Sequence, residues 1–215
     1  MDIKGCIFDL DGVVVDTAKY HYLAWKKLGA ELGFDFTEQD NERLKGVSRM
    51  RSLDILLEIG GLTISQEEKE AAATKKNEWY LEFIHQMQPD EILPGVLDFF
   101  NQLKENNIKI ALGSASKNAV LILDILKIKD YFDVIVDGNS VSKAKPDPEV
   151  FTQGAEKMGL TAAECVVFED AEAGVEAAKN GGMRCVGIGE QDVLSLADVV
   201  VSGFTEFNIE NLKAL

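Results

Sequence analysis

Short apolar runs recur along the chain and are rich in β-branched residues, as buried strands are. The expected strands span residues 3 to 8, 109 to 114, 134 to 138, 165 to 170, 185 to 188 and 199 to 201. Apolar residues at helical spacing fill most of the segments between them, at residues 96 to 106, 119 to 126, 150 to 158 and 173 to 179. This alternation predicts an α/β fold with right-handed crossovers and a Rossmann-like, doubly wound parallel sheet.

The first hundred residues break this alternation, because no strand pattern follows residue 8 until about residue 108. Helical patterns fill the gap, at residues 19 to 32, 48 to 60 and 65 to 87. The last of these opens with a capping box, Ser65-Gln66-Glu67-Glu68. We therefore expect a small all-helical cap domain over residues 15 to 92, inserted into a core domain of residues 1 to 14 and 93 to 215.

Two pairs of acidic residues lie at the carboxyl ends of expected strands. Asp9 and Asp11 flank Leu10 after the first strand, and Glu169 and Asp170 end a later one. In open α/β sheets the carboxyl ends of the strands form the rim where ligands bind. Like charges this close repel unless a cation or a shared proton stabilises them, and Mg²⁺ prefers oxygen ligands. The pattern favours a metal site, although a solvated acidic turn explains the first pair equally well on its own.

Phosphate-suited residues follow other expected strands toward the same rim. The stretch Ser114-Ala115-Ser116-Lys117-Asn118 leads into a helix, so its hydroxyl and backbone N–H groups offer an anion site. Lys145 is followed by Pro146, which keeps the backbone extended before the next helix. Two acid pairs, a hydroxyl and a lysine at strand ends together predict a site for a metal ion and a phosphate.

Composition narrows the choice of partners and compartment. With 22 Lys and Arg against 37 Asp and Glu, the formal charge of −15 argues against nucleic acid and anionic membranes, which select basic surfaces. A phosphorylated substrate would therefore need a local cluster of cations. Cys6, Cys165 and Cys185 lie in expected strands without metal-type spacing, as buried thiols of a reducing compartment do. With no leader and no apolar run of about 18 residues, we expect a soluble, cytoplasmic monomer.

Four motifs, taken in order, resemble those of the haloacid dehalogenase superfamily of aspartyl-phosphate enzymes. They are Asp9-Leu10-Asp11-Gly12, Ser114, Lys145 and Glu169-Asp170, and the resemblance covers essentially the whole chain. It implies that Asp9 is the nucleophile that accepts a phosphoryl group. It also implies that Asp11 is the general acid and base, and that Thr17 belongs to the catalytic set.

The same resemblance implies a cofactor and its ligands. Mg²⁺ would be held by Asp9, Asp11, Glu169 and Asp170, with Asp11 contributing its backbone carbonyl and Glu169 acting as a ligand or as a partner of one. Ser114 and Lys145 would hold the oxygens of the transferring phosphoryl group.

Within the superfamily, residues 44 to 49 and 113 to 118, with Asp16-Thr17, His21 and Trp25, resemble mutases that act on β-glucose 1-phosphate. The resemblance implies a substrate pocket formed by His21, Trp25, Lys45, Gly46, Val47, Arg49, Ser52, Lys76, Ser114, Ala115, Ser116, Lys117 and Asn118. The planar guanidinium group of Arg49 can form two parallel hydrogen bonds with a phosphate. The resemblance assigns it, together with Ser116, Lys117 and Asn118, to the distal phosphate, which is the phosphate that is not being transferred.

The implied reaction passes a phosphoryl group from Asp9 to O6 of β-D-glucose 1-phosphate. β-D-glucose 1,6-bisphosphate is then both primer and intermediate, and D-glucose 6-phosphate is the product. Closure of the cap about connections near residues 16 to 17 and 91 to 94 would exclude water. A small sugar-phosphate phosphatase and a non-catalytic sugar-phosphate sensor are the alternatives, although a sensor typically lacks Asp9, Asp11 or Lys145.

Some of these positions have a purely structural explanation or depart from the superfamily pattern. His21 and Trp25, one helical turn apart, could form a packed aromatic face, and Lys76 could lie on a solvated helix face. Ala171 stands where the superfamily often has a hydroxyl residue, and Gly113 stands where a bulkier small residue is common.

Overall fold

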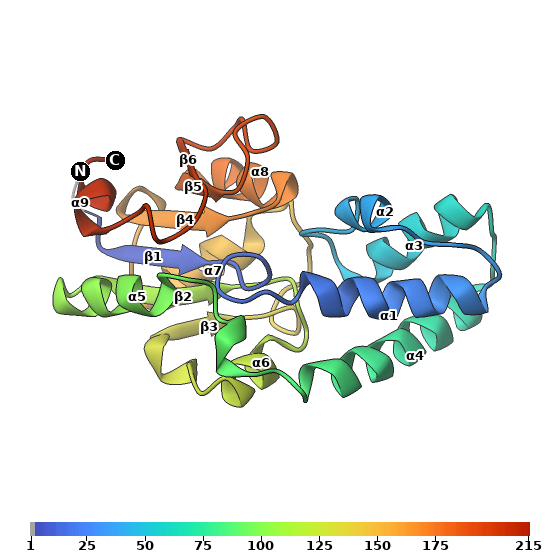
Figure 1. Ribbon diagram of the computed structural model, residues 1–215. Coiled ribbons are helices and arrows are strands. Elements are labelled where there is room, and N and C mark those ends of the chain that lie inside the picture. Colours follow the sequence, from blue (N-terminus) through green and yellow to red (C-terminus); the bar gives the residue numbers. More distant parts are fainter. Residues whose placement is uncertain (1–2) are drawn as a thin grey trace.

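A six-stranded, fully parallel sheet lies at the centre of the core, as the computed structural model of residues 3 to 215 shows (Figure 1). Its strands are β1 Gly5–Phe8, β2 Lys109–Gly113, β3 Val134–Val136, β4 Cys165–Glu169, β5 Arg184–Ile188 and β6 Val199–Val201. Their order in the sheet is β3-β2-β1-β4-β5-β6. The order reverses on the two sides of β1, and such a switch point is where open α/β sheets bind ligands.

Helices cover both faces of the sheet, which confirms the doubly wound α/β architecture. The helices are α1 Ala18–Glu31, α2 Glu38–Glu42, α3 Arg49–Gly60, α4 Gln66–Ile84, α5 Val96–Glu105, α6 Ala119–Ile125, α7 Glu149–Met158, α8 Glu172–Asn180 and α9 Ile209–Lys213. Buried residues of α7 and α8 pack on one face of the sheet, and those of α5, α6 and α9 pack on the other. Three short 3₁₀ helices lie at Pro89–Glu91, Lys129–Tyr131 and Ala162–Glu164.

Helices α1 to α4 form a separate group beyond the carboxyl ends of the strands (Figure 1). The chain enters and leaves this group through two segments that pair with each other: Asp16 N–H donates to the Glu91 carbonyl at 2.9 Å, and Leu93 N–H donates to the Val14 carbonyl at 3.0 Å. Two short connections side by side are what a hinge at these positions requires.

Local signals explain where the inserted helices begin and end. The Ser48 hydroxyl accepts a hydrogen bond from Arg51 N at 3.3 Å, and Gly61 ends α3 in the left-handed conformation. The predicted capping box at Ser65 forms, with Glu68 as its partner. Such caps satisfy N–H groups that the first helical turn leaves unpaired.

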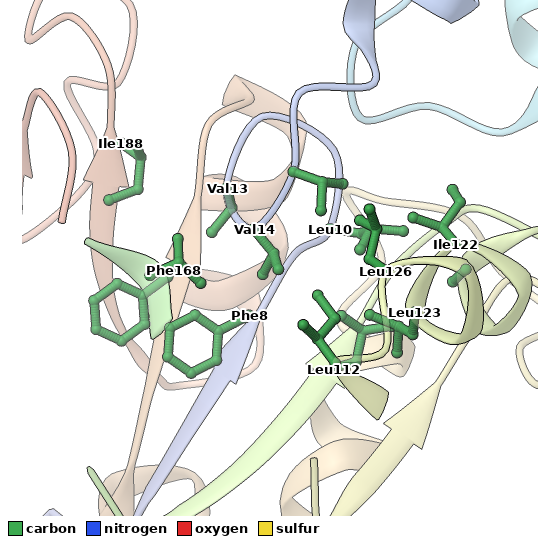
Figure 2. Close-up of a cluster of buried hydrophobic side chains, with 14 of the residues drawn as sticks. Phe8, Leu10, Val13, Val14, Leu112, Ile122, Leu123, Leu126, Phe168 and Ile188 are labelled. Atoms are coloured by element: carbon green, nitrogen blue, oxygen red, sulfur yellow. The ribbon is translucent and has the colours of Figure 1, made fainter. Parts of the chain in front are cut away.

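Buried side chains anchor the loop that follows β1. Figure 2 shows Phe8 beside Phe168 of the neighbouring strand, with their ring centroids 4.7 Å apart, and Leu10, Val13 and Val14 in the same cluster. Leu10, Val13 and Val14 are fully buried. Burial of each such side chain contributes about 1.5 to 3 kcal/mol to the stability of the folded state. These contacts therefore hold the backbone of the loop in place at the acidic residues on both sides of Leu10.

The strands and the long helices confirm the sequence-based predictions, with small differences at their ends. β1 begins at Gly5 rather than at residue 3, and β2, β3 and β4 end one or two residues earlier than predicted. The five-residue helices α2 and α9 were not predicted. The three cysteines are buried and free, as expected. Within residues 3 to 215, none of the helices has the length and apolar character needed to cross a membrane.

Candidate active site

A cleft of about 650 Å³ is lined by the ends of the central strands and by the inserted helices. The structure brings sixteen predicted site residues to its wall: Asp9, Asp11, His21, Trp25, Lys45, Gly46, Val47, Arg49, Ser52, Lys76, Ala115, Ser116, Lys117, Asn118, Lys145 and Asp170. Three further predicted residues, Thr17, Ser114 and Glu169, are fully buried and form hydrogen bonds with residues that line the cleft. Thr17 donates to Asp11, Ser114 accepts from Ser116 N, and Glu169 accepts from Lys145.

Lys145 joins two buried carboxylates at the base of the cleft. Its Nζ donates to Asp9 and, at 2.7 Å, to Glu169 Oε1. Burial alone would lower the pKa of Lys145, but Asp9 and Glu169 together raise it above its usual value. Burial raises the pKa of Asp9 to about 7, although Lys145 opposes this shift. Lys145 is thus a permanent cation placed directly beside the candidate nucleophile.

Asp11 has an environment that favours the protonated form of its carboxyl group more than water does. Its carboxylate accepts a hydrogen bond from the Thr17 hydroxyl, and its own N–H donates to Asp9 Oδ2 at 3.0 Å. Burial raises the pKa of Asp11, while the Thr17 hydrogen bond and the charges of Lys145 and Lys76 oppose the increase. A raised pKa favours the protonated carboxyl group, which is the form that a general acid needs in order to donate a proton.

Asp170 completes an acidic cluster that suits a divalent cation. Oxygens of Asp9, Glu169 and Asp170 all lie within 4.8 Å of one another. Burial, followed by the charges of Glu169 and Asp9, raises the pKa of Asp170 well above its usual value. A side chain at Gly12 would overlap the Asp170 carboxylate, so the glycine is needed for the two loops to meet. Two buried carboxylates and a half-buried third, with a single ammonium beside them, leave negative charge that a hard cation would offset.

Lys76 is buried rather than solvated, so the solvated-helix explanation for it was wrong. Its Nζ lies 2.9 Å from His21 Nδ1 and above the rings of Trp25 and Tyr80, at 4.5 and 4.7 Å from their centroids. Burial, then the Lys76 and Arg49 charges, lowers the pKa of His21 well below its usual value. His21 Nε2, on the other side of the ring, lies 3.9 Å from Asp11 Oδ1.

A second polar group comes from other segments than the one that carries Asp9. Ser116, Lys117 and Asn118 follow β2, Arg49 begins α3, and all four line the cleft. Asn118 Nδ2 donates to Asn77 Oδ1 of α4 at 2.9 Å, so a hydrogen bond links the core to the inserted helices at this end.

Two asparagines that line the cleft were not predicted from the sequence. Asn77 lies on α4 one turn after Thr74, which also lines the cleft, and Asn41 lies in the unpredicted helix α2. Asn41 is 7% exposed, and within the described part of the chain its Oδ1 has no hydrogen-bond partner. The Asn-Glu-Arg context of residue 41 gave no signal that this side chain would be buried.

The two departures from the superfamily pattern have packing explanations. A Cβ at Gly113 would lie 2.7 Å from Phe151 Cδ1 and 3.0 Å from Ile7 Cγ2. The Phe151 ring also lies under the Lys145 ammonium, 4.7 Å from ring centroid to Nζ. Ala171 lies against Gly46 of the inserted segment, so a small residue lets the two loops approach.

Comparisons with known proteins agree with this geometry. The family profile described as haloacid dehalogenase-like hydrolase matches residues 3 to 182. The chain is 42% identical to a β-phosphoglucomutase of Bacillus subtilis over 98% of its length and 94% of that protein's. It is 33% identical to a phosphorylated carbohydrates phosphatase of Thermotoga maritima, over 85% of its length and 83% of that protein's.

A solved structure extends the likeness to three dimensions. The crystal structure of a β-phosphoglucomutase from Clostridium difficile matches with a TM-score of 0.94 and 42% identity, covering 99% of this chain and 96% of that one. The matching profile covers most of the chain, and the folds agree throughout. The protein is therefore an enzyme of the haloacid dehalogenase-like hydrolase family.

Proposed function

We propose that the protein is a Mg²⁺-dependent β-phosphoglucomutase that interconverts β-D-glucose 1-phosphate and D-glucose 6-phosphate. The observation that carries the proposal is that one cleft holds two separate groups suited to phosphate. Lys145 stands beside Asp9, and Arg49 lines the same cleft together with Ser116, Lys117 and Asn118. A phosphatase needs only the first group, whereas a bisphosphate intermediate needs both. The cleft volume lies within the range of about 300 to 1,000 Å³ that is common for small-ligand sites.

The residues divide the reaction into two phosphoryl transfers. In the first, O6 of β-D-glucose 1-phosphate attacks phospho-Asp9, its proton passes to Asp11, and the bond from phosphorus to Asp9 breaks. The resulting β-D-glucose 1,6-bisphosphate then reverses its orientation. In the second, Asp9 attacks the C1 phosphoryl group, and Asp11 returns the proton to the departing O1. Lys145, with Ser114 behind the loop, offsets charge on the phosphoryl oxygens.

Asp9 and Asp170 would hold Mg²⁺, with the Asp11 backbone carbonyl as a further ligand. Glu169 is already engaged by Lys145 and by Ala171 N, at 2.7 and 2.8 Å, which favours a role as partner of the site over direct ligation. When bound, the ion supplies positive charge that offsets the negative charge of the phosphoryl group.

We also propose that residues 15 to 92 move as a cap on the core of residues 1 to 14 and 93 to 215. Water competes with the sugar for phospho-Asp9, so closure favours transfer over hydrolysis. The Thr17 hydroxyl, bonded to Asp11, places the general acid next to the connection at which the cap would turn.

The decisive experiment compares two products formed from β-D-glucose 1-phosphate. With Mg²⁺ and catalytic β-D-glucose 1,6-bisphosphate present, we expect D-glucose 6-phosphate to form much faster than inorganic phosphate. Excess EDTA should abolish turnover. Phosphate as the dominant product would instead favour the sugar-phosphate phosphatase alternative, which the Thermotoga maritima relative supports.

A further inference from the structure

The turn that follows β3, residues 137 to 140, packs against the segment that carries Ser116, Lys117 and Asn118. Gly138 N–H donates to the Ser116 carbonyl at 3.1 Å, and Asn139 Nδ2 donates to the Lys117 carbonyl at 3.0 Å. Two successive carbonyl oxygens of the segment are therefore engaged by the turn. An unengaged carbonyl in this segment would be free to face, and repel, an anionic group in the cleft.

The turn is itself held in one conformation by a buried carboxylate. Asp137, only 7% exposed, accepts hydrogen bonds from Asn139 N at 3.0 Å, Asn139 Nδ2 at 2.9 Å and Ser140 Oγ at 2.9 Å. A buried carboxylate without such donors would be costly, so these three contacts favour a single arrangement of the turn.

Close approach of the two backbones requires a glycine at residue 138. A Cβ there would overlap the carbonyl group of Ala115 and lie 3.1 Å from Lys117 N. The turn therefore touches the segment along three consecutive residues, 115 to 117. Its contacts position backbone atoms of residues whose side chains line the cleft.

We propose that the turn Asp137–Ser140 is a positioning element for the distal phosphate, acting through Asn139 and Gly138 on Ser116, Lys117 and Asn118. This inference rests on the proposed function, in which those three side chains hold the phosphate that is not being transferred. Asn139 touches no reacting atom. Its loss should weaken binding of a substrate that has a distal phosphate, and it should leave phosphoryl transfer to Asp9 unchanged.

The test uses two matched variants. Asn139→Ala and Ser140→Ala each remove side-chain donation to Asp137, but only Asn139→Ala also frees the Lys117 carbonyl. KM and kcat are measured with β-D-glucose 1-phosphate, and phosphorylation of Asp9 is measured with acetyl phosphate, a donor without a distal phosphate. For Asn139→Ala we expect KM to rise roughly three- to tenfold, as for one lost hydrogen bond, with the acetyl phosphate rate unchanged. Ser140→Ala should resemble the wild type in both assays.

A third variant and a direct binding measurement complete the design. Gly138→Ala should raise KM more than Asn139→Ala, because the segment itself must move. Equal KM changes in the two matched variants, or an equal loss with acetyl phosphate, would overturn the inference. If the wild type only releases phosphate, the proposed function fails, and the inference is judged by calorimetric titration with D-glucose 6-phosphate. If Asn139→Ala binds D-glucose 6-phosphate more weakly than Ser140→Ala does, the inference is supported. If the two variants bind it equally, or if the wild type does not bind it, the inference is overturned.

Discussion

Replacement of Asp11 by Asn removes proton transfer and one negative charge while keeping the local hydrogen bonds of the site. The amide keeps an oxygen that accepts from the Thr17 hydroxyl, and the contact from residue 11 to Asp9 is made by the backbone N–H. Asn also keeps the backbone carbonyl that we assign to Mg²⁺. What it loses is the ability to take a proton from the sugar oxygen and return it.

The size of the loss follows from that single change. General acid and base catalysis typically contributes about 10²- to 10⁴-fold, so Asp11→Asn should lower kcat by this factor, or about 3 to 5 kcal/mol. The Mg²⁺ affinity should change little, because no ligand is removed. Phosphorylation of Asp9 by acetyl phosphate should persist, since that leaving group needs little protonation, and Asp9→Ala should abolish it.

Steady-state kinetics and calorimetric Mg²⁺ titration test this reasoning. Thr17→Val is the control for the environment of Asp11, because it removes a hydrogen bond that lowers the Asp11 pKa. The pKa of Asp11 should therefore rise. The limb of the pH–rate profile that reports the ionisation of Asp11 should move to higher pH. If Asp11→Asn turns over near the wild-type rate, or fails only because it no longer binds Mg²⁺, then Asp11 is not the proton carrier.

Three further predictions concern the distal subsite, the core and the acidic cluster. Arg49→Lys should damage the mutase reaction more than phosphorylation by acetyl phosphate, because an ammonium does not replace a bidentate fork; equal losses would remove Arg49 from the distal subsite. Gly113→Ala should lower the free energy of unfolding in urea by about 1 to 3 kcal/mol through overlap with Phe151, whereas Gly203→Ala, with open space around it, should have little effect. Burial and neighbouring carboxylates raise the pKa of Asp9 in the folded state to about 7. At pH values between the ordinary pKa of an aspartate and 7, the folded protein therefore binds more protons than the unfolded protein. In EDTA the thermal stability should therefore fall as pH rises through this window, and saturating Mg²⁺ should flatten the dependence; a rise with pH in EDTA would contradict the assignment.

The sequence was sufficient for the parts of the fold that depend on repeated local pattern. Strands with apolar runs and helices with several turns of apolar spacing carry that pattern many times, and they were predicted to within a few residues. Helices α2 and α9 have five residues each, so they present little more than one turn of periodicity. Their capping residues, Thr37 and Asn208, were the available signals, and capping residues are equally common in turns.

The candidate site was predictable where topology alone brings residues together. In a parallel sheet all carboxyl ends share one rim, so Asp9, Ser114 and Asp170 had to lie at the same edge once the strands were recognised. The burial of Lys76 was not predictable, since it depends on Trp25 and His21 of another helix as well as on Tyr80 of its own. The turn at Asp137 gave no signal either, because its function depends on contact with the segment after β2.

The charges around the cleft explain how an acidic protein could attract a doubly charged substrate. The chain carries a formal charge of −15, yet six basic and four acidic side chains line the cleft: Lys45, Arg49, Lys76, Lys117, Lys143 and Lys145 against Asp9, Asp11, Glu70 and Asp170. Burial and the charge of Arg49 lower the pKa of Lys76 well below its usual value, so the other five carry most of the positive charge. Repulsion from the rest of the surface is screened beyond about 8 Å at physiological salt, so the local excess dominates once a phosphate reaches the opening. The basic side chains come from both walls, three from the inserted helical segment and three from the core. Under the proposed function, like charges on the two walls would oppose closure of the cleft, and a sugar phosphate between them would offset that repulsion. We therefore expect substrate binding and closure to favour each other.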